Sequence, residues 1–192
     1  EFRLTANQNL AISNIPAVQK AEIEAILEKY KILKSHERSA LRLYSIACVS
    51  LPTCGLALAE AERYLPVLVT DLEEVVEACG LRHDAITIRM TGCPNGCGRP
   101  FLSEIAFVGR GPGRYNLYLG GGHAGQRLNK LYRQDILGVD AKEILKPIIE
   151  DYAKNREDGE RFGDFVIRAG YVAATVNGPD FHKNIKPEAI PS

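Results

Sequence analysis

Apolar residues recur along the chain at two spacings, one typical of amphipathic helices and one typical of short strands. Where the spacing is helical, strong helix formers fill the positions between the apolar residues. The helices predicted in this way cover residues 17–30, 55–65, 67–80, 128–135 and 140–156. Pro66 interrupts the pattern between the second and third of these helices, because proline does not fit a helix interior.

Short runs rich in β-branched and aromatic residues predict strands. They cover residues 2–5, the first part of 43–54 (LYSIACVSLPTC), 85–90 (AITIRM), 103–110 and 114–121, and residues 164–176 are predicted to be a strand or extended chain. Strands alternating with helices predict an α/β or α+β fold, with a mixed sheet, helices packed on it and AITIRM as a central strand. We expect residues 1–178 to form one region, and residues 179–192 to form a polar tail.

The charge balance of the chain does not indicate a particular kind of partner. The 192 residues contain 24 basic and 24 acidic side chains, so nothing favours nucleic acid or a membrane surface as a partner. No apolar run reaches the roughly 18 residues that would span a bilayer, and no signal peptide is visible. The chain opens on Glu1 inside an alternating pattern. This indicates a piece cut from a longer protein, and a complete protein trimmed of a tag is the alternative.

Five cysteines carry the most specific pattern in the sequence. An odd number cannot pair completely within the chain, and without an export signal we expect a reducing, cytoplasmic setting. Cys48 and Cys54 form a C-x5-C pair, and Cys93 and Cys97 form a C-x3-C pair. Cys79 stands alone at the end of a predicted helix, where we interpret it as a small buried hydrophobic residue.

Four clustered cysteines favour a metal centre, and two kinds of centre remain open. Structural zinc favours two to four residues between paired ligands, which suits the second pair better than the first. An iron–sulfur cluster has a separate iron for each thiolate, so it tolerates wider and unequal spacings, although these spacings differ from the common ferredoxin patterns. The segment TGCPNGCGRP (91–100) is compact and lets backbone amides approach an anionic centre. We also expect a helix to begin after Cys54, with its amides favouring an anion.

At these residues the chain resembles the hemoprotein (β) subunits of NADPH-dependent sulfite reductases. The resemblance is carried by ACVSLPTCGLALAEAERYLP and TGCPNGCGRPFLSEIAFVGRGPGRYNLYLGG, and it extends from FRLTANQNL to GDFVIRAG. It corresponds to the C-terminal part of that family's proteins. It implies half of the pseudo-symmetric siroheme sulfite and nitrite reductase fold.

The resemblance implies two coupled cofactors, a 4Fe-4S cluster and a siroheme. Carried over by motif, the cluster ligands are Cys48, Cys54, Cys93 and Cys97, and the sulfur of Cys97 also ligates the siroheme iron. Further residues expected at the siroheme are Gln8, Asn9, Arg99, Arg114 and Arg127. Polar surface positions are the alternative interpretation for each of these five residues.

The function implied is the six-electron reduction of sulfite to sulfide. The family's N-terminal half supplies most of the basic residues around substrate and siroheme, so we assign no catalytic residue here and expect the chain to be inactive alone. The partners implied are that half of the reductase, a flavoprotein subunit that oxidises NADPH, and sulfite. A siroheme nitrite reductase, a ferredoxin-dependent sulfite reductase, and a non-catalytic metal or electron-transfer module remain alternatives.

Overall fold

The computed structural model describes residues 1–5, 7–32, 38–178 and 180, and the chain divides into two compact units, Glu1–Ser39 and Ala40–Ser192. Most of the predicted polar tail lies outside the described residues. No helix in the described ranges is long and apolar enough to cross a membrane.

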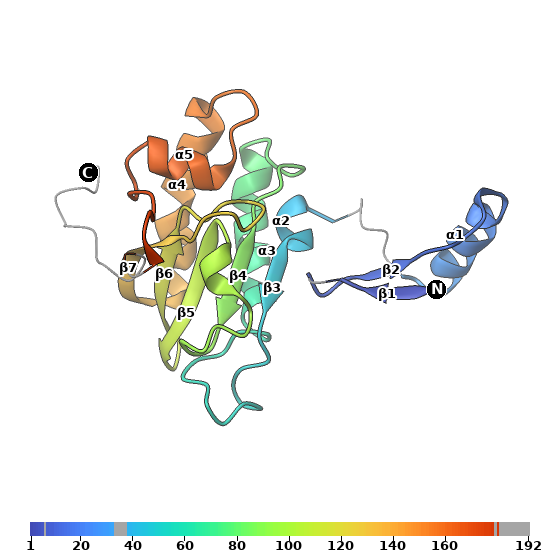
Figure 1. The fold of residues 1–192 in the computed structure, drawn as a ribbon, viewed down its shortest axis with the longest axis horizontal. Helices are drawn as coiled ribbons and strands as arrows, with labels where there is room; N and C mark the ends of the chain where they lie inside the picture. The colour runs from blue at the N-terminus through green and yellow to red at the C-terminus, as the bar shows by residue number, and fades with distance from the viewer. Residues whose placement is uncertain (6, 33–37, 179, 181–192) are drawn as a thin grey trace. The chain divides into compact units, whose positions relative to one another are not determined.

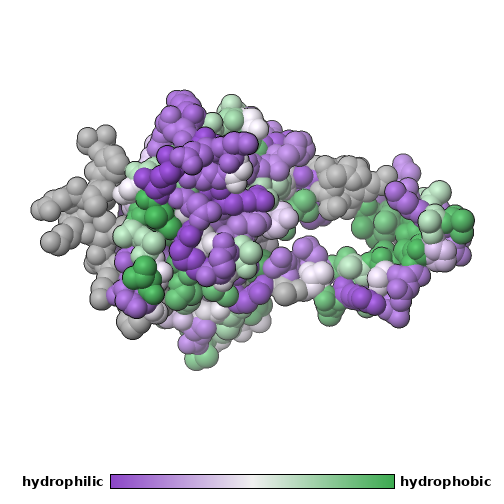
Figure 2. All heavy atoms as spheres, turned by 45° about the horizontal axis from the view of Figure 1, so that its top comes forward, coloured by the Kyte–Doolittle hydropathy of each residue, from purple (hydrophilic) through white to green (hydrophobic). Residues whose placement is uncertain are grey.

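The unit Glu1–Ser39 consists of a β-hairpin and a helix. Strand β1 (Phe2–Leu4) pairs antiparallel with β2 (Leu10–Ile12), and a 3-10 turn, η1 (Ala17–Gln19), leads into α1 (Lys20–Lys29). The strand and helix predicted in this region are confirmed. The apolar side chains of this unit are largely exposed, as the hydrophobic surface in Figure 2 shows; they include Phe2, Leu4, Leu10, Val18, Tyr30 and Ile32.

The unit Ala40–Ser192 is built on a five-stranded mixed sheet (Figure 1). Its strands are β3 (Ser45–Ala47), β4 (Ile88–Thr91), β5 (Ile105–Gly111), β6 (Arg114–Leu119) and β7 (Lys130–Leu137), hydrogen-bonded in that order. The pairs β3–β4 and β4–β5 are parallel, and the pairs β5–β6 and β6–β7 are antiparallel. The predicted mixed sheet is confirmed, with β4 in an interior position.

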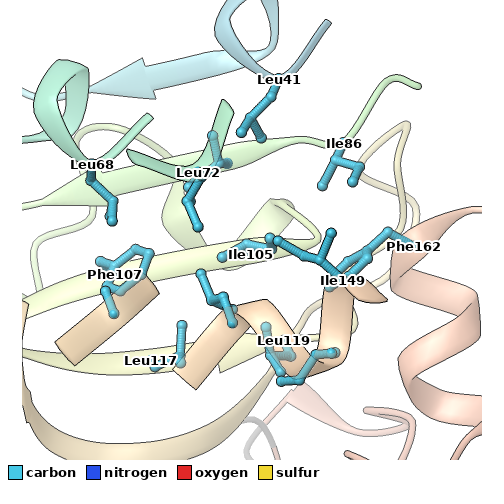
Figure 3. Close-up of a cluster of buried hydrophobic side chains, with 14 of the residues drawn as sticks. Leu41, Leu68, Leu72, Ile86, Ile105, Phe107, Leu117, Leu119, Ile149 and Phe162 are labelled. Atoms are coloured by element: carbon cyan, nitrogen blue, oxygen red, sulfur yellow. The ribbon is translucent and has the colours of Figure 1, made fainter. Parts of the chain in front are cut away.

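Helices cover one face of this sheet and enclose the main hydrophobic core. The helices of the unit are α2 (Ala40–Leu43), α3 (Leu65–Ala78), α4 (Ala141–Asn155) and α5 (Phe162–Arg168), with 3-10 turns η3 (Pro100–Leu102) and η4 (Gly138–Asp140). Figure 3 shows side chains from α3 and α4, such as Leu72 and Ile149, meeting Ile105 and Leu117 of the sheet. Side chains on β5 alternate between faces, so Ala106 and Val108 belong to a smaller cluster on the other face, beside Phe101.

Three predicted elements are wrong, each because tertiary contacts decide the local structure. Residues 55–64 form turns, since the amides of Leu58 and Ala59 donate to Gly92 O rather than to a helix of their own. Pro66 lies in the first turn of α3, where its missing N–H costs nothing, so it helps to begin a helix rather than interrupt one.

The other two errors concern the choice between helix and strand. The predicted helix at 128–135 is strand β7, because its backbone pairs with β6. The predicted extended chain at 164–176 begins inside α5 instead. The buried Phe162, Phe165 and Val166 recur there at helical spacing.

Candidate metal centre

The loop of Cys48 and Cys54 and the loop of Cys93 and Cys97 begin at neighbouring strand ends. Cys48 directly follows β3, and Gly92 and Cys93 directly follow β4. Because β3 and β4 are parallel and adjacent, their carboxyl ends lie at the same edge of the sheet. The amide of Cys48 donates to Met90 O over 3.1 Å, which extends the pairing of the two strands up to the loops.

Gly92 joins the two halves of the cysteine pattern. Its amide lies 3.4 Å from Cys48 Sγ, and its carbonyl accepts hydrogen bonds from Leu58 N and Ala59 N at 2.8 and 3.1 Å. A Cβ at this position would collide with the side chain of Ser50, so only glycine fits. Ser50 O in turn accepts from Cys54 N over 2.7 Å. The loop that carries Cys54 is therefore folded against the residue next to Cys93.

The turn that carries Cys93 and Cys97 lies directly on Cys48. It is closed by hydrogen bonds from Gly96 N to Cys93 O (3.4 Å) and from Arg99 N to Gly96 O (2.8 Å). A Cβ on Gly98 would stand 3.3 Å from Cys48 N and 3.0 Å from Met90 O, closer than most side chains pack. The loop of Cys48 and Cys54 and the loop of Cys93 and Cys97 thus meet at one edge of the sheet.

The four thiols differ in their exposure. Cys93 is buried, Cys48 and Cys54 are half-buried, Cys97 is exposed, and all are free thiols. Within the described ranges, no three His, Cys, Asp or Glu side chains are arranged to hold a metal ion. Thiolate sulfurs suit zinc, copper and iron–sulfur clusters, and the Gly92 amide beside Cys48 Sγ is the kind of donor that stabilises cluster-bound sulfur.

Comparison with known proteins gives a consistent family. The chain is 59% identical over 187 residues to the sulfite reductase (NADPH) hemoprotein beta-component of Methylorubrum populi, and 57% identical over 183 residues to that of Shouchella clausii. These alignments cover 97% and 95% of the chain. The chain is a homologue of part of the sulfite reductase hemoprotein beta-component. It spans about 30% of the length of the curated relatives it matches.

A solved structure supports the same relationship. The NirA protein of Mycobacterium tuberculosis superposes with a TM-score of 0.74 at 30% identity, over 88% of this chain and 33% of that protein. No protein-family model matches the chain. The resemblance to sulfite reductase hemoproteins stated from the cysteine motifs is confirmed, as is the α/β fold.

Cys79 of this sulfite reductase homologue lies away from the cysteine loops. It caps the C-terminal end of α3, whose 14 residues span about 20 Å. The N-terminal end of helix α3 lies near the cysteine loops, because Glu62, three residues before the helix, donates from its amide to Cys48 O over 3.1 Å. The C-terminal end, with Cys79, is therefore distant from them. Burial raises the pKa of the Cys79 thiol, helped by the charge of Glu150. Cys79 packs against the main core, as predicted.

The three arginines expected near the siroheme occupy different environments. Arg99 is exposed in a left-handed conformation (φ 53°), two residues after Cys97. Arg114 forms a two-pronged ion pair with Asp135 at 2.7 and 2.9 Å, and its guanidinium lowers the pKa of that carboxyl group. Arg127 donates to Gly120 O and pairs with Asp164 at 2.6 Å, beyond the end of β6 and therefore at the sheet edge opposite the cysteines. Their contact with a siroheme stays a prediction.

Gln8 and Asn9 lie in the turn between β1 and β2, within the unit Glu1–Ser39. Gln8 is exposed with a φ of 59°, while Asn9 O accepts from Thr5 N over 2.9 Å and Asn9 N donates to Thr5 Oγ1 over 3.1 Å. Their assignment to the siroheme edge also stays a prediction.

The sequence motifs missed two residues that shape the site. Ser50, buried and left-handed (φ 55°), donates from its hydroxyl to Ala59 O and so closes the Cys54 loop. Arg89 is a buried cation in the middle of β4, just before the Cys93 turn. An arginine inside the apolar run AITIRM was a visible signal for the second residue, whereas nothing in the sequence marks the first.

Proposed function

We propose that Cys48, Cys54, Cys93 and Cys97 ligate a 4Fe-4S cluster, and that the sulfur of Cys97 also ligates the iron of a siroheme. The observation that carries the proposal is the meeting of the two cysteine-bearing loops around Gly92, whose amide lies 3.4 Å from Cys48 Sγ. Cys97 suits the shared position because it is the exposed thiol of the four, so a second group has access to it.

The residues around the thiols prepare the site for an anionic centre. The Gly92 amide reduces the charge on the Cys48 sulfur, and Gly98 allows the Cys97 turn to lie against Cys48. When bound, the two cofactors would supply the electrons that reduce the substrate. Of the arginines, we place Arg99 nearest the siroheme because of its position after Cys97, then Arg114, whose pairing with Asp135 competes, and then Arg127.

For the whole protein we propose the six-electron reduction of sulfite to sulfide. The support is the naming of the relatives as NADPH sulfite reductase hemoproteins, at 57–59% identity. The word "beta-component" in those names supports a second component, which we propose to be a flavoprotein that oxidises NADPH. The rest of the reductase, which includes its N-terminal half, would supply the cations and acids that an anionic substrate requires. We therefore expect this chain to be inactive alone, and we place the protein in the cytoplasm, where free cysteines persist.

Anaerobic reconstitution of the chain with ferrous iron and sulfide tests the cluster. We expect a brown protein with about four irons and four sulfides per chain. Replacing Cys48, Cys54, Cys93 or Cys97 by serine should remove most of the bound iron, because a hydroxyl is a poor ligand for iron in such clusters. The matched control is Cys79→Ser, which should load as well as the unchanged chain. Stoichiometric zinc instead of iron and sulfide, or full loading of all four serine variants, would overturn the assignment.

A second experiment tests the shared ligand in the full-length reductase. Cys97→Ser should abolish sulfide production per siroheme and alter the visible spectrum, whereas Cys79→Ser should leave both largely unchanged. Normal turnover in the Cys97 variant would move the shared ligand to another cysteine.

A further inference from the structure

Arg89 is a charged side chain in an otherwise apolar strand. It lies on β4, where its backbone pairs with Ile46 of β3 and Ala106 of β5. Only 7% of its surface is exposed. Its neighbours Ile88 and Met90 point into the main core, so Arg89 occupies the other face of the sheet.

No acidic side chain compensates this buried charge within the part of the chain that the structure describes. The Nη1 atom donates to Arg99 O over 2.9 Å, while the Nε atom is buried and has no hydrogen-bond partner among the described residues. Burial lowers the pKa of the Arg89 guanidinium, and the positive charge of Arg99 lowers it further. A buried cation without an anion is costly, because it has lost its water and gained no opposite charge.

The guanidinium of Arg89 lies at the base of the Cys93–Cys97 turn. Its strand runs through Thr91 directly into Gly92 and Cys93. The carbonyl that it binds belongs to Arg99, two residues after Cys97 and held in the left-handed region. The same carbonyl accepts a longer bond from Leu102 N at 3.3 Å. Arg89 therefore binds the end of the Cys93–Cys97 turn through the backbone carbonyl of Arg99.

We infer that Arg89 is the internal counter-cation of the cluster centre, and that it positions the Cys97 turn through the carbonyl of Arg99. This inference rests on the proposed cluster site. Four thiolates around an iron–sulfur cluster bring net negative charge to this edge of the sheet, and that charge is the missing partner of Arg89. The arginine thus costs stability while the thiols are free and stabilises the chain once the cluster is bound.

Replacing Arg89 should affect the metal-free chain and the cluster-loaded chain in opposite directions. Arg89→Met removes the charge and keeps the aliphatic stem, so the melting temperature of the metal-free chain should stay the same or rise. The same variant, reconstituted anaerobically, should lose iron several-fold faster to a chelator. The midpoint potential of its cluster should be more negative, since a nearby positive charge favours the reduced form. Arg89→Lys keeps the charge and should restore much of the potential.

Arg42→Met is the matched control, because Arg42 is partly buried but paired with Glu73 at 2.5 and 3.0 Å. It should lower the stability of the metal-free and the loaded chain alike. If Arg89→Met also destabilises both states equally, and leaves the potential unchanged, Arg89 is only structural and the inference is wrong while the cluster assignment stands. If the unchanged chain binds no cluster, the proposed function fails and the inference fails with it.

Discussion

The sheet of the unit Ala40–Ser192 has one edge where β4 and β5 begin and an opposite edge where the cysteine loops lie. These two edges differ in how far the chain itself satisfies their polar side chains. At the edge where β4 and β5 begin, the fully buried Glu104 accepts hydrogen bonds from Thr87 N (2.8 Å), Thr87 Oγ1 (3.1 Å) and Gly163 N (3.0 Å), and lies 3.2 Å from His123 Nδ1. At the opposite edge, the thiols of the cysteine loops are free, and within β4, the strand that leads to it, Arg89 Nε has no partner in the described structure.

One edge satisfies its buried carboxylate with hydrogen bonds from the chain, whereas the other edge carries free thiols that can bind a ligand. Both carboxylate oxygens of the fully buried Glu104 accept hydrogen bonds from the chain itself, so this side chain serves the fold. The cysteine edge uses mainly backbone hydrogen bonds to bring its loops together and leaves sulfur atoms available. A substitution at the first edge should therefore affect folding, and one at the second should affect loading with iron.

Glu104→Ala should have the largest effect on stability. It leaves the buried amides of Thr87 and Gly163 without an acceptor, and we expect a loss of about 3–5 kcal/mol in the free energy of unfolding. Urea denaturation of the metal-free chain measures this loss, and Glu104→Gln, which keeps one oxygen acceptor, should lose less. Iron bound per folded chain should not change, and reduced loading of the folded fraction would contradict the separation of the two edges.

Gly98→Ala should have a smaller effect on stability and a clear effect on loading. Its new Cβ would press on Met90 O and Cys48 N, which are backbone atoms that cannot turn aside. We expect a loss of about 1–3 kcal/mol and a several-fold drop in iron bound after reconstitution. Gly55→Ala is the control, since Gly55 follows Cys54 but has open space around its Cβ position. Equal loading of both variants would show that the close approach at Gly98 is not needed.

Cys79→Ser should lower stability by about 1 kcal/mol, because its hydroxyl would lie in a partly buried, apolar site at the end of α3. Thermal unfolding measures the change. Iron content after reconstitution should match that of the unchanged chain. A fall in iron content comparable to that of Cys48→Ser would place Cys79 among the ligands.

The smallest effect concerns alkaline pH. Burial raises the pKa of Tyr152 to about 12, while its hydroxyl donates to Glu160 O over 3.0 Å. An unfolded tyrosine loses its proton near pH 10, so between pH 10 and 12 the unfolded chain binds fewer protons than the folded one. Stability should fall with rising pH across that window. Tyr152→Phe should be less stable at pH 8 but show a shallower fall, measured by urea denaturation at each pH; an unchanged slope would contradict the shift.

The sequence indicated the parts of the fold whose pattern is local. Helices α3 and α4 follow from apolar spacing because each buries one regular face, and strand β4 follows from a short β-branched run that is buried throughout. The sequence of strand β7 predicts a helix, because its true structure depends on pairing with β6, a contact that no short window contains. The sequence around helix α5 predicts a strand or extended chain, because its run of apolar residues is also typical of strands.

The candidate site shows the same limit. Spacing and family resemblance predict the four cysteines as ligands, and the fold brings their loops together. The approach of the Gly92 amide to Cys48 and the bond from Arg89 to Arg99 depend on the register between β3 and β4, which is a property of the folded sheet. Sequence patterns indicate candidate ligands such as the cysteines more readily than the residues that position them, such as Gly92 and Arg89.

The contact between Gly92 and Cys48 also has a consequence for the order of folding. It joins residues 44 positions apart, and helix α3 lies between them. Contacts of such long separation form late, because the intervening chain must first be closed at a cost in entropy. The turn of Cys93 and Cys97 closes over only a few residues and can form early. We expect a nascent chain to present two thiols first and four only when β3 has paired with β4, so that cluster insertion follows completion of the fold.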